Sequence, residues 1–182
     1  YNYWSLLSLK NFFEKFDSCI YRAEKIDTHG GSLRVYIKKG KKNKIENSVG
    51  KILKEEKKFG IDKFETYKKF GKKIVQIRKN VIKNIRDLKK QNKKIIGYGA
   101  PAKATTALNF YGVSDEIDFI VEDNKLKHNK IIPGVNIPIK DKNNVVKKDN
   151  IVIVLAWNFF DEIKKNNTNL SNNFISIKSL EN

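Results

Sequence analysis

The sequence lacks methionine and holds few residues of several other kinds. Its 182 residues include no Met, one Cys, three Pro and two His. A natural translation product begins with Met and this sequence begins with Tyr1, so we expect a piece of a longer protein. The single Cys19 excludes a disulfide framework and a zinc cluster, and it is expected to be a small core residue of a cytoplasmic protein.

Long apolar runs are also missing. No stretch approaches the ~20 apolar residues that a membrane-spanning helix needs, so we expect no membrane partner. No signal-peptide pattern is visible, which agrees with a cytoplasmic location. Neither a metal-ligand spacing nor a Ser/His/Asp order is evident, so we expect no metal site.

Acidic residues are scarce beside lysine, and the formal net charge is +18. Residues 38–94 carry 22 Lys and Arg against six Asp and Glu, which is +16 of that total. Only four of the basic residues are Arg, the residue that base-edge readers use for bidentate contacts: Arg22, Arg34, Arg78 and Arg86. We therefore interpret the lysines as solvated surface and expect no nucleic-acid partner, with a nucleic-acid-binding module as an alternative.

The N-terminal part is predicted to form a helix, two strands and a linker. The ranges are a helix at 5–16, strands at 19–27 and 32–39, a tight turn at 28–31, and a polar linker at 40–58. Ser5 is a candidate helix cap. We expect residues 1–58 to be a segment that links to a missing upstream domain, and residues 59–182 to be a separate C-terminal domain.

One long amphipathic helix is predicted from about residue 62 to residue 91. Its apolar positions recur every three or four residues and form one stripe, while lysines occupy the other faces. The stripe consists of Phe64, Tyr67, Phe70, Ile74, Ile77, Val81, Ile85 and Leu88.

Strands and helices alternate after residue 94, which predicts an α/β fold with a doubly wound, mainly parallel sheet. The expected strands are 95–98, 117–123, 150–157 and 174–180. The expected helices are 101–111 and 158–166, the second capped by Asn158, and residues 124–139 are expected to be a long loop.

The stretch KKIIGYGAPAKATTALNFYG, residues 93–112, reads as strand, glycine turn and helix. Gly97 and Gly99 permit a tight turn and the close approach of a ligand. The helix that follows directs its free N–H groups and positive dipole end to the same place. Lys103 adds a cation there, and Thr105 or Thr106 adds a hydroxyl. The pattern indicates an anion site, although a turn that only lets helix meet strand remains the alternative.

Two acids, Glu122 and Asp123, stand at the end of the next predicted strand. That is where dinucleotide-binding folds place the acid that holds ribose. The loop reads G-Y-G-A-P-A rather than G-x-G-x-x-G, so a stand-alone NAD-type module is the second hypothesis. His29 lies before Gly30, and a lone His is more often structural than catalytic. His128, in a lysine-rich loop, is expected to be exposed.

Four stretches together resemble the C-terminal domain of the S-adenosylmethionine-dependent sugar C-methyltransferase family. They are THGGSLRVYI (28–37), GYGAPAKATTALNFYGV (97–113), IVEDNKLKHNKIIPGVNIPI (120–139) and VLAWNFFDEI (154–163). Two departures are Ala104-Thr105, where many members have Gly-Asn, and Lys125, where Pro is common.

The resemblance implies a three-part parent enzyme: a zinc module, a methyltransferase domain that binds S-adenosylmethionine, and this Rossmann-like domain, which helps to hold a nucleotide-linked deoxysugar. It implies that a catalytic Glu-His pair and the zinc cysteines lie upstream of Tyr1. By the same resemblance, a base of the parent enzyme is expected to remove a proton next to a 4-keto group, and the enolate to attack the methyl group of S-adenosylmethionine. The chain alone is then expected to be inactive and to bind no cofactor.

The partners implied are the nucleotide sugar and the upstream methyltransferase domain. No catalytic residue is assigned in this chain, with His29 as the one candidate that could approach the sugar. The predicted substrate-binding residues are Gly97, Tyr98, Gly99, Ala100, Lys103, Thr105, Asp123 and Asn124.

Overall fold

The computed structural model describes residues 3–40, 44–145 and 149–182. The chain divides into two compact units, residues 1–72 and 73–182, and each is described below by itself. The domain boundary predicted between residues 58 and 59 stays a prediction. None of the helices in the described ranges is long and apolar enough to cross a membrane.

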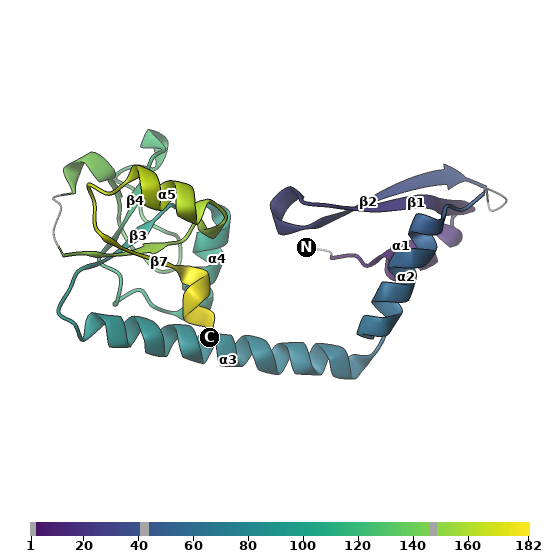
Figure 1. Cartoon of the computed structure of the whole chain (residues 1–182), viewed down its shortest axis with the longest axis horizontal. Helices are drawn as coiled ribbons and strands as arrows, with labels where there is room; N and C mark the ends of the chain where they lie inside the picture. The colour runs from purple at the N-terminus through teal and green to yellow at the C-terminus, as the bar shows by residue number, and fades with distance from the viewer. Residues whose placement is uncertain (1–2, 41–43, 146–148) are drawn as a thin grey trace. The chain divides into compact units, whose positions relative to one another are not determined.

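The first unit holds two helices, a two-stranded sheet and the start of a third helix (Figure 1). Its elements are α1 (Leu6–Glu14), β1 (Ser18–Ile26), β2 (Ser32–Lys39), α2 (Asn47–Phe59) and the first residues of α3 (Phe64–Lys89). Strands β1 and β2 pair antiparallel. The turn between them contains Gly30 and Gly31, which both have positive φ, as the predicted tight turn requires. Ser5 caps α1 through a hydrogen bond from the Ser8 amide to its side chain, as predicted.

Helix α2 corrects the prediction of a polar linker over residues 40–58. Val49 and Ile52, three residues apart, are buried against Leu6 and Ile20 in the core of the first unit. The surrounding lysines lower the mean hydropathy of the segment and hide this short apolar face. The helix ends at Gly60, whose φ of +77° gives the left-handed cap typical of helix C-termini.

The second unit is an α/β sandwich around a five-stranded parallel sheet, and this confirms the predicted fold class (Figure 1). The strands are β3 (Ile95–Tyr98), β4 (Phe119–Glu122), β5 (Ile139–Asp141), β6 (Ile151–Val154) and β7 (Asn173–Ser176), in the order β5-β4-β3-β6-β7. The helices are the rest of α3, then α4 (Ala102–Tyr111) and α5 (Phe160–Asn166).

Both faces of this sheet are apolar because helices cover both of them. On one face Ile95 and Ile153 pack in a core shared with Val81 of α3 and Leu108 of α4. On the other face the neighbouring strand residues pack in a second core, which α5 contacts through Ile163. Strand residues alternate between the two faces, so each strand contributes to both cores.

One strand of the second unit was not predicted, and one local prediction is wrong. Residues 139–141 form β5, an edge strand that begins at the last residue of the predicted loop, and three residues are too few for an alternating pattern to show. Asn158 does not cap a helix. It lies inside a 3-10 turn, Trp157–Phe159, and α5 begins only at Phe160.

Gly97→Ala should lower the free energy of unfolding by about 1–2 kcal/mol, because overpacking a core is destabilising. A Cβ at this position would lie 2.8 Å from Cγ1 of Ile120 and 3.0 Å from Cδ1 of Leu155, two buried side chains. Urea unfolding followed by circular dichroism measures the change. Gly50→Ala is the control, because a Cβ at Gly50 in α2 meets nothing within 4 Å. An unchanged midpoint for Gly97→Ala would contradict this account of the packing.

Candidate functional site

A cleft lies beside β3, where the chain switches from adding strands on one side of the sheet to adding them on the other. The chain runs from β3 through β4 to β5 on one side, and then from β6 to β7 on the other. Ligands of open α/β sheets bind at this switch point, beyond the carboxyl ends of the strands. A cavity of about 440 Å³ lies there, and its lining includes residues at the ends of β3, β4, β5 and β6.

Gly99 makes the turn at the end of β3. Its φ of +87° is left-handed, and its amide donates to the Val121 carbonyl at 2.8 Å, which extends the pairing with β4. A Cβ here would lie 3.0 Å from Cβ of Ala156, which also lines the cleft. The glycine therefore lets the ends of β3 and β6 approach each other and keeps the cleft open above them.

Glu122 ties the glycine turn to the end of β4. Its carboxylate accepts the Ala100 amide at 2.8 Å and the Asn124 amide at 3.1 Å. The ammonium of Lys127 lies 3.3 Å from the same carboxylate and donates to the Ala100 carbonyl at 2.9 Å. Burial acts to raise the pKa of Glu122, but the two amide hydrogen bonds and Lys127 outweigh it, and the pKa is lowered.

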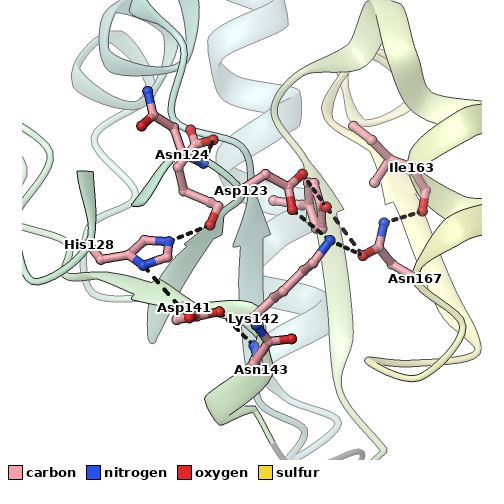
Figure 2. A network of polar contacts seen from close by, with 10 residues as sticks. Asp123, Asn124, His128, Asp141, Lys142, Asn143, Ile163 and Asn167 are labelled. Carbon is pink, nitrogen blue, oxygen red and sulfur yellow. Dashed lines mark hydrogen bonds and ion pairs between the residues drawn. The ribbon is translucent and has the colours of Figure 1, made fainter. Parts of the chain in front are cut away.

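Asp123 lies at the centre of a second network (Figure 2). The Lys142 ammonium is 2.6 Å from Oδ1 of Asp123 and 3.3 Å from Oδ1 of Asn167. The Tyr98 hydroxyl donates to Oδ2 of Asp123 at 2.8 Å. Asn167 is buried, and its amide nitrogen donates to the Ile163 carbonyl at 2.8 Å. These contacts fix polar groups from β3, β4, β5 and α5 around the cleft.

The ionisation of this network suits binding rather than proton transfer. Burial, followed by the hydrogen bond to Asp123, raises the pKa of Tyr98, so this phenol remains protonated at neutral pH. Burial acts to raise the pKa of Asp123, but Lys142 and Tyr98 outweigh it and lower the pKa. Asp123 is thus a carboxylate acceptor and Tyr98 a donor across the neutral range.

His128 belongs to the frame of the site. Its Nε2 lies 2.7 Å from the Glu122 carbonyl, which only accepts, so Nε2 carries the proton. Its Nδ1 lies 3.8 Å from a carboxylate oxygen of Asp141 (Figure 2). The side chain is only 14% exposed, so the predicted exposed position is wrong. In the parts of the chain that the structure describes, no three His, Cys, Asp or Glu side chains gather as metal ligands would.

Three of the predicted binding residues line the cleft together: Tyr98, Gly99 and Asp123. Three others lie beside it and shape it: buried Gly97 and Ala100, and Asn124 through its amide bond to Glu122.

Two predicted residues and the catalytic candidate lie apart from this group. Lys103 is exposed on α4 with Nζ 5.5 Å from the centre of the Trp157 ring, and it does not line the cavity. Thr105 is half-buried on α4, also outside the lining. The structure describes the backbone of His29, in the turn Thr28–Gly30, but not its side chain.

Five polar residues of the cleft were not selected from the sequence: Lys127, Lys142, Glu162, Asn166 and Asn167. Lys142 follows β5, a strand that was not predicted, and Asn167 follows α5. Neither Lys142 nor Asn167 belongs to one of the four motifs. Recognising β5 would have placed Lys142 at the carboxyl edge of the sheet, which is the one signal that could have found it.

Tyr98→Phe should raise the pKa of Asp123 toward its ordinary value, because the substitution removes one donor to the carboxylate and keeps the ring. The carboxyl ¹³C chemical shift of Asp123, followed by NMR through an acid titration, measures the change. The matched control is Tyr67→Phe, whose hydroxyl donates to the Ile61 carbonyl in the first unit. An unaltered Asp123 titration in Tyr98→Phe would contradict the network.

Comparison with known proteins identifies the family of this chain. A family model described as the C-methyltransferase C-terminal domain matches residues 27–176, a range that includes every strand of the parallel sheet. The chain belongs to this family. It is also 30% identical over 169 residues to the C-methyltransferase NovU of Streptomyces niveus, a match that covers 91% of this chain and 40% of that protein.

The family match confirms the resemblance drawn from the four sequence motifs. The chain spans about two-fifths of the length of the relative that it matches. The relative therefore contains a larger part that the match does not reach.

Proposed function

We propose that this chain is the sugar-nucleotide-binding, C-terminal part of an S-adenosylmethionine-dependent C-methyltransferase that acts on a nucleotide-linked keto-deoxysugar, and that it is inactive alone. The observation that carries the proposal is the cleft at the switch point, whose lining includes the carboxylate of Asp123, held in position by Lys142. Family membership supports the class of reaction, since the relative is named as a C-methyltransferase.

The chemistry of the cleft suits a sugar joined to a phosphate chain. The Asp123 carboxylate and the Lys142 ammonium provide an acceptor and a donor for hydroxyl groups. Phe159 is 60% exposed at the cleft and offers a ring for stacking. Pro101 also lines the cleft and directly precedes α4, so a diphosphate at this end of the cleft would approach the positive N-terminus of that helix. The cavity of about 440 Å³ falls in the range of small-molecule sites.

S-adenosylmethionine would supply the methyl group from a domain outside this chain. The lining of this cleft carries three carboxylates and two ammonium groups, Glu122, Asp123, Glu162, Lys127 and Lys142, so its charge does not select against a sulfonium, and the calorimetry below separates the two ligands. A base for proton removal belongs, by family resemblance, to the same outside domain. In our proposal this chain positions the sugar and does not transfer the proton.

The dinucleotide hypothesis meets an obstacle at the glycine turn. Dinucleotide folds direct the amides of this turn at a pyrophosphate. Here the Glu122 carboxylate already accepts the Ala100 amide, and Lys127 holds the carboxylate in place. A pyrophosphate on that amide would have to displace a carboxylate of like charge. A sugar deeper in the cleft, with its diphosphate toward α4, avoids the conflict.

Isothermal calorimetry on the 182-residue chain tests the proposal with three probes: a thymidine diphosphate hexose, S-adenosylmethionine and NADH. We expect heat of binding only for the nucleotide sugar. Binding of S-adenosylmethionine with no response to the sugar would overturn the assignment. Binding of NADH alone would favour the dinucleotide module. A crystal soaked with the same sugar nucleotide would locate it against Asp123 and Phe159.

A further inference from the structure

The first unit carries a set of large rings on its surface that its own core does not use. We call six of them the aromatic surface: Tyr3, Trp4, Phe12, Phe16, Tyr67 and Phe70. Each is more than two-fifths exposed. A groove of about 760 Å³ runs among them, between the start of α1 and the start of α3. Exposed apolar patches of this kind mark interaction sites.

The six rings form one continuous surface. Tyr3, Trp4, Tyr67 and Phe70 line the groove. Ring centroids of Trp4 and Phe12 lie 5.6 Å apart, and those of Phe12 and Phe16 lie 5.0 Å apart, so the surface continues along α1. The Tyr67 hydroxyl donates to the Ile61 carbonyl at 2.6 Å, which fixes this ring at the wall of the groove.

Helix α3 shows that this exposure is local. Its sequence carries one apolar stripe along the whole helix. In the second unit Val81 and Ile85 of that stripe are fully buried against the sheet. In the first unit Tyr67 and Phe70 of the same stripe are exposed. Burying such side chains is favourable, so the exposed part of the stripe could stabilise contact with a partner.

The lining of the groove indicates the chemistry of its partner. Of the 182 residues, 38 are Lys or Arg, yet none of the fourteen residues that line the groove is basic. A solvated surface of this chain would hold several lysines, and a site for an anion would need them. The lining holds two acids, Glu56 and Asp62, and Glu56 already accepts the Leu6 and Leu7 amides. Aromatic rings without cations fit a polypeptide surface with apolar side chains, since aromatic residues are enriched in protein interfaces.

We propose that the aromatic surface is the docking face for the methyltransferase part of the parent polypeptide. This inference rests on the proposed function, which places such a part before this chain. NovU extends well beyond the two-fifths that match. Tyr3 is itself in the groove, so a polypeptide joined before it is held there at high effective concentration. The surface therefore sets how the sugar-binding unit is attached to the catalytic part.

Hydroxyl-radical oxidation read by mass spectrometry tests this directly, because it reports the exposure of individual rings. The 182-residue chain is compared with the longer protein that contains it. We expect Trp4, Tyr67 and Phe70 to be oxidised readily in the chain alone and severalfold more slowly in the longer protein. Phe110, an exposed ring of the second unit, is the internal reference and should be oxidised at the same rate in both.

Variants make the result specific to the groove. Phe70→Lys in the longer protein should restore the oxidation of Trp4 to its rate in the isolated chain. Val75→Lys places the same charge on an exposed apolar position of α3 outside the groove, and should leave Trp4 protected.

Equal oxidation of the rings in both proteins overturns the proposal. So does protection in the isolated chain together with sedimentation as a dimer, since the occupant is then a second copy. These readouts need no nucleotide sugar, so they succeed or fail separately from the calorimetry.

Discussion

Lys142→Ala should weaken the binding of a thymidine diphosphate hexose to the 182-residue chain by about ten- to a hundredfold, which is the loss of one charge-assisted hydrogen bond. Lys142 neutralises Asp123 at 2.6 Å and reaches Asn167 at 3.3 Å. Without it, the Asp123 carboxylate stands uncompensated in a cleft that also contains Glu122 and Glu162. A doubly charged diphosphate is then repelled, and the acceptor for the sugar loses its fixed position.

Calorimetry with the variant and the parent chain measures this loss. The control is Lys140→Ala, which removes the same charge two residues earlier on β5. Lys140 is exposed, does not line the cleft, and lies with Nζ 4.5 Å from the centre of the Phe119 ring. Equal affinities for the Lys142 variant and the parent would exclude this cleft as the sugar-nucleotide site. Circular dichroism of both variants establishes that the fold is kept.

Glu122→Ala should lower the free energy of unfolding at neutral pH by about 2–3 kcal/mol, because a buried amide and an ammonium lose their shared acceptor. The amide is that of Ala100, which is buried, and the ammonium is that of Lys127. The glycine turn would lose its tie to β4, so the cleft should also bind the sugar nucleotide more weakly. Urea unfolding at neutral pH measures the first effect and calorimetry the second.

The same substitution should change how stability depends on pH. The pKa of Glu122 in the folded chain is below its ordinary value of 4.5, so the unfolded chain binds the proton first as pH falls. The stabilisation by Glu122 is complete at pH values above about 4.5, and it is lost as the pH falls through the pKa that Glu122 has in the folded chain. The difference in unfolding free energy between parent and variant should therefore shrink in acid. A difference that stays constant from neutral pH into acid would show that ionised Glu122 is not the source.

Local sequence patterns were enough to predict many of the strands and helices of the second unit. Short apolar runs predicted β3, β6 and the alternation with helices, because a parallel sheet covered on both faces requires such strands. The glycine turn at Gly99 and the acid at Asp123 were also predictable, since both follow directly from their position after a strand. The motifs around them were enough to indicate the family, which the family match confirms.

Helix α2 and strand β5 show where local pattern was insufficient. The core-facing side chains of α2 are few among lysines, and only packing against the hairpin distinguishes Val49 and Ile52 from linker residues. Strand β5 has three residues and is defined by its hydrogen bonds to β4 rather than by its own composition. Both exist because of partners distant in sequence.

The sequence by itself determined the α/β class, the glycine turn and the family, because these depend on short-range order along the chain. Only the tertiary structure decided which polar groups meet in the cleft. Asp123, Lys142 and Asn167 come together because the strand order places the ends of β4 and β5 beside the end of α5. The same holds for the aromatic surface: one stripe on α3 is core in one unit and exposed in the other, and only the packing partners differ.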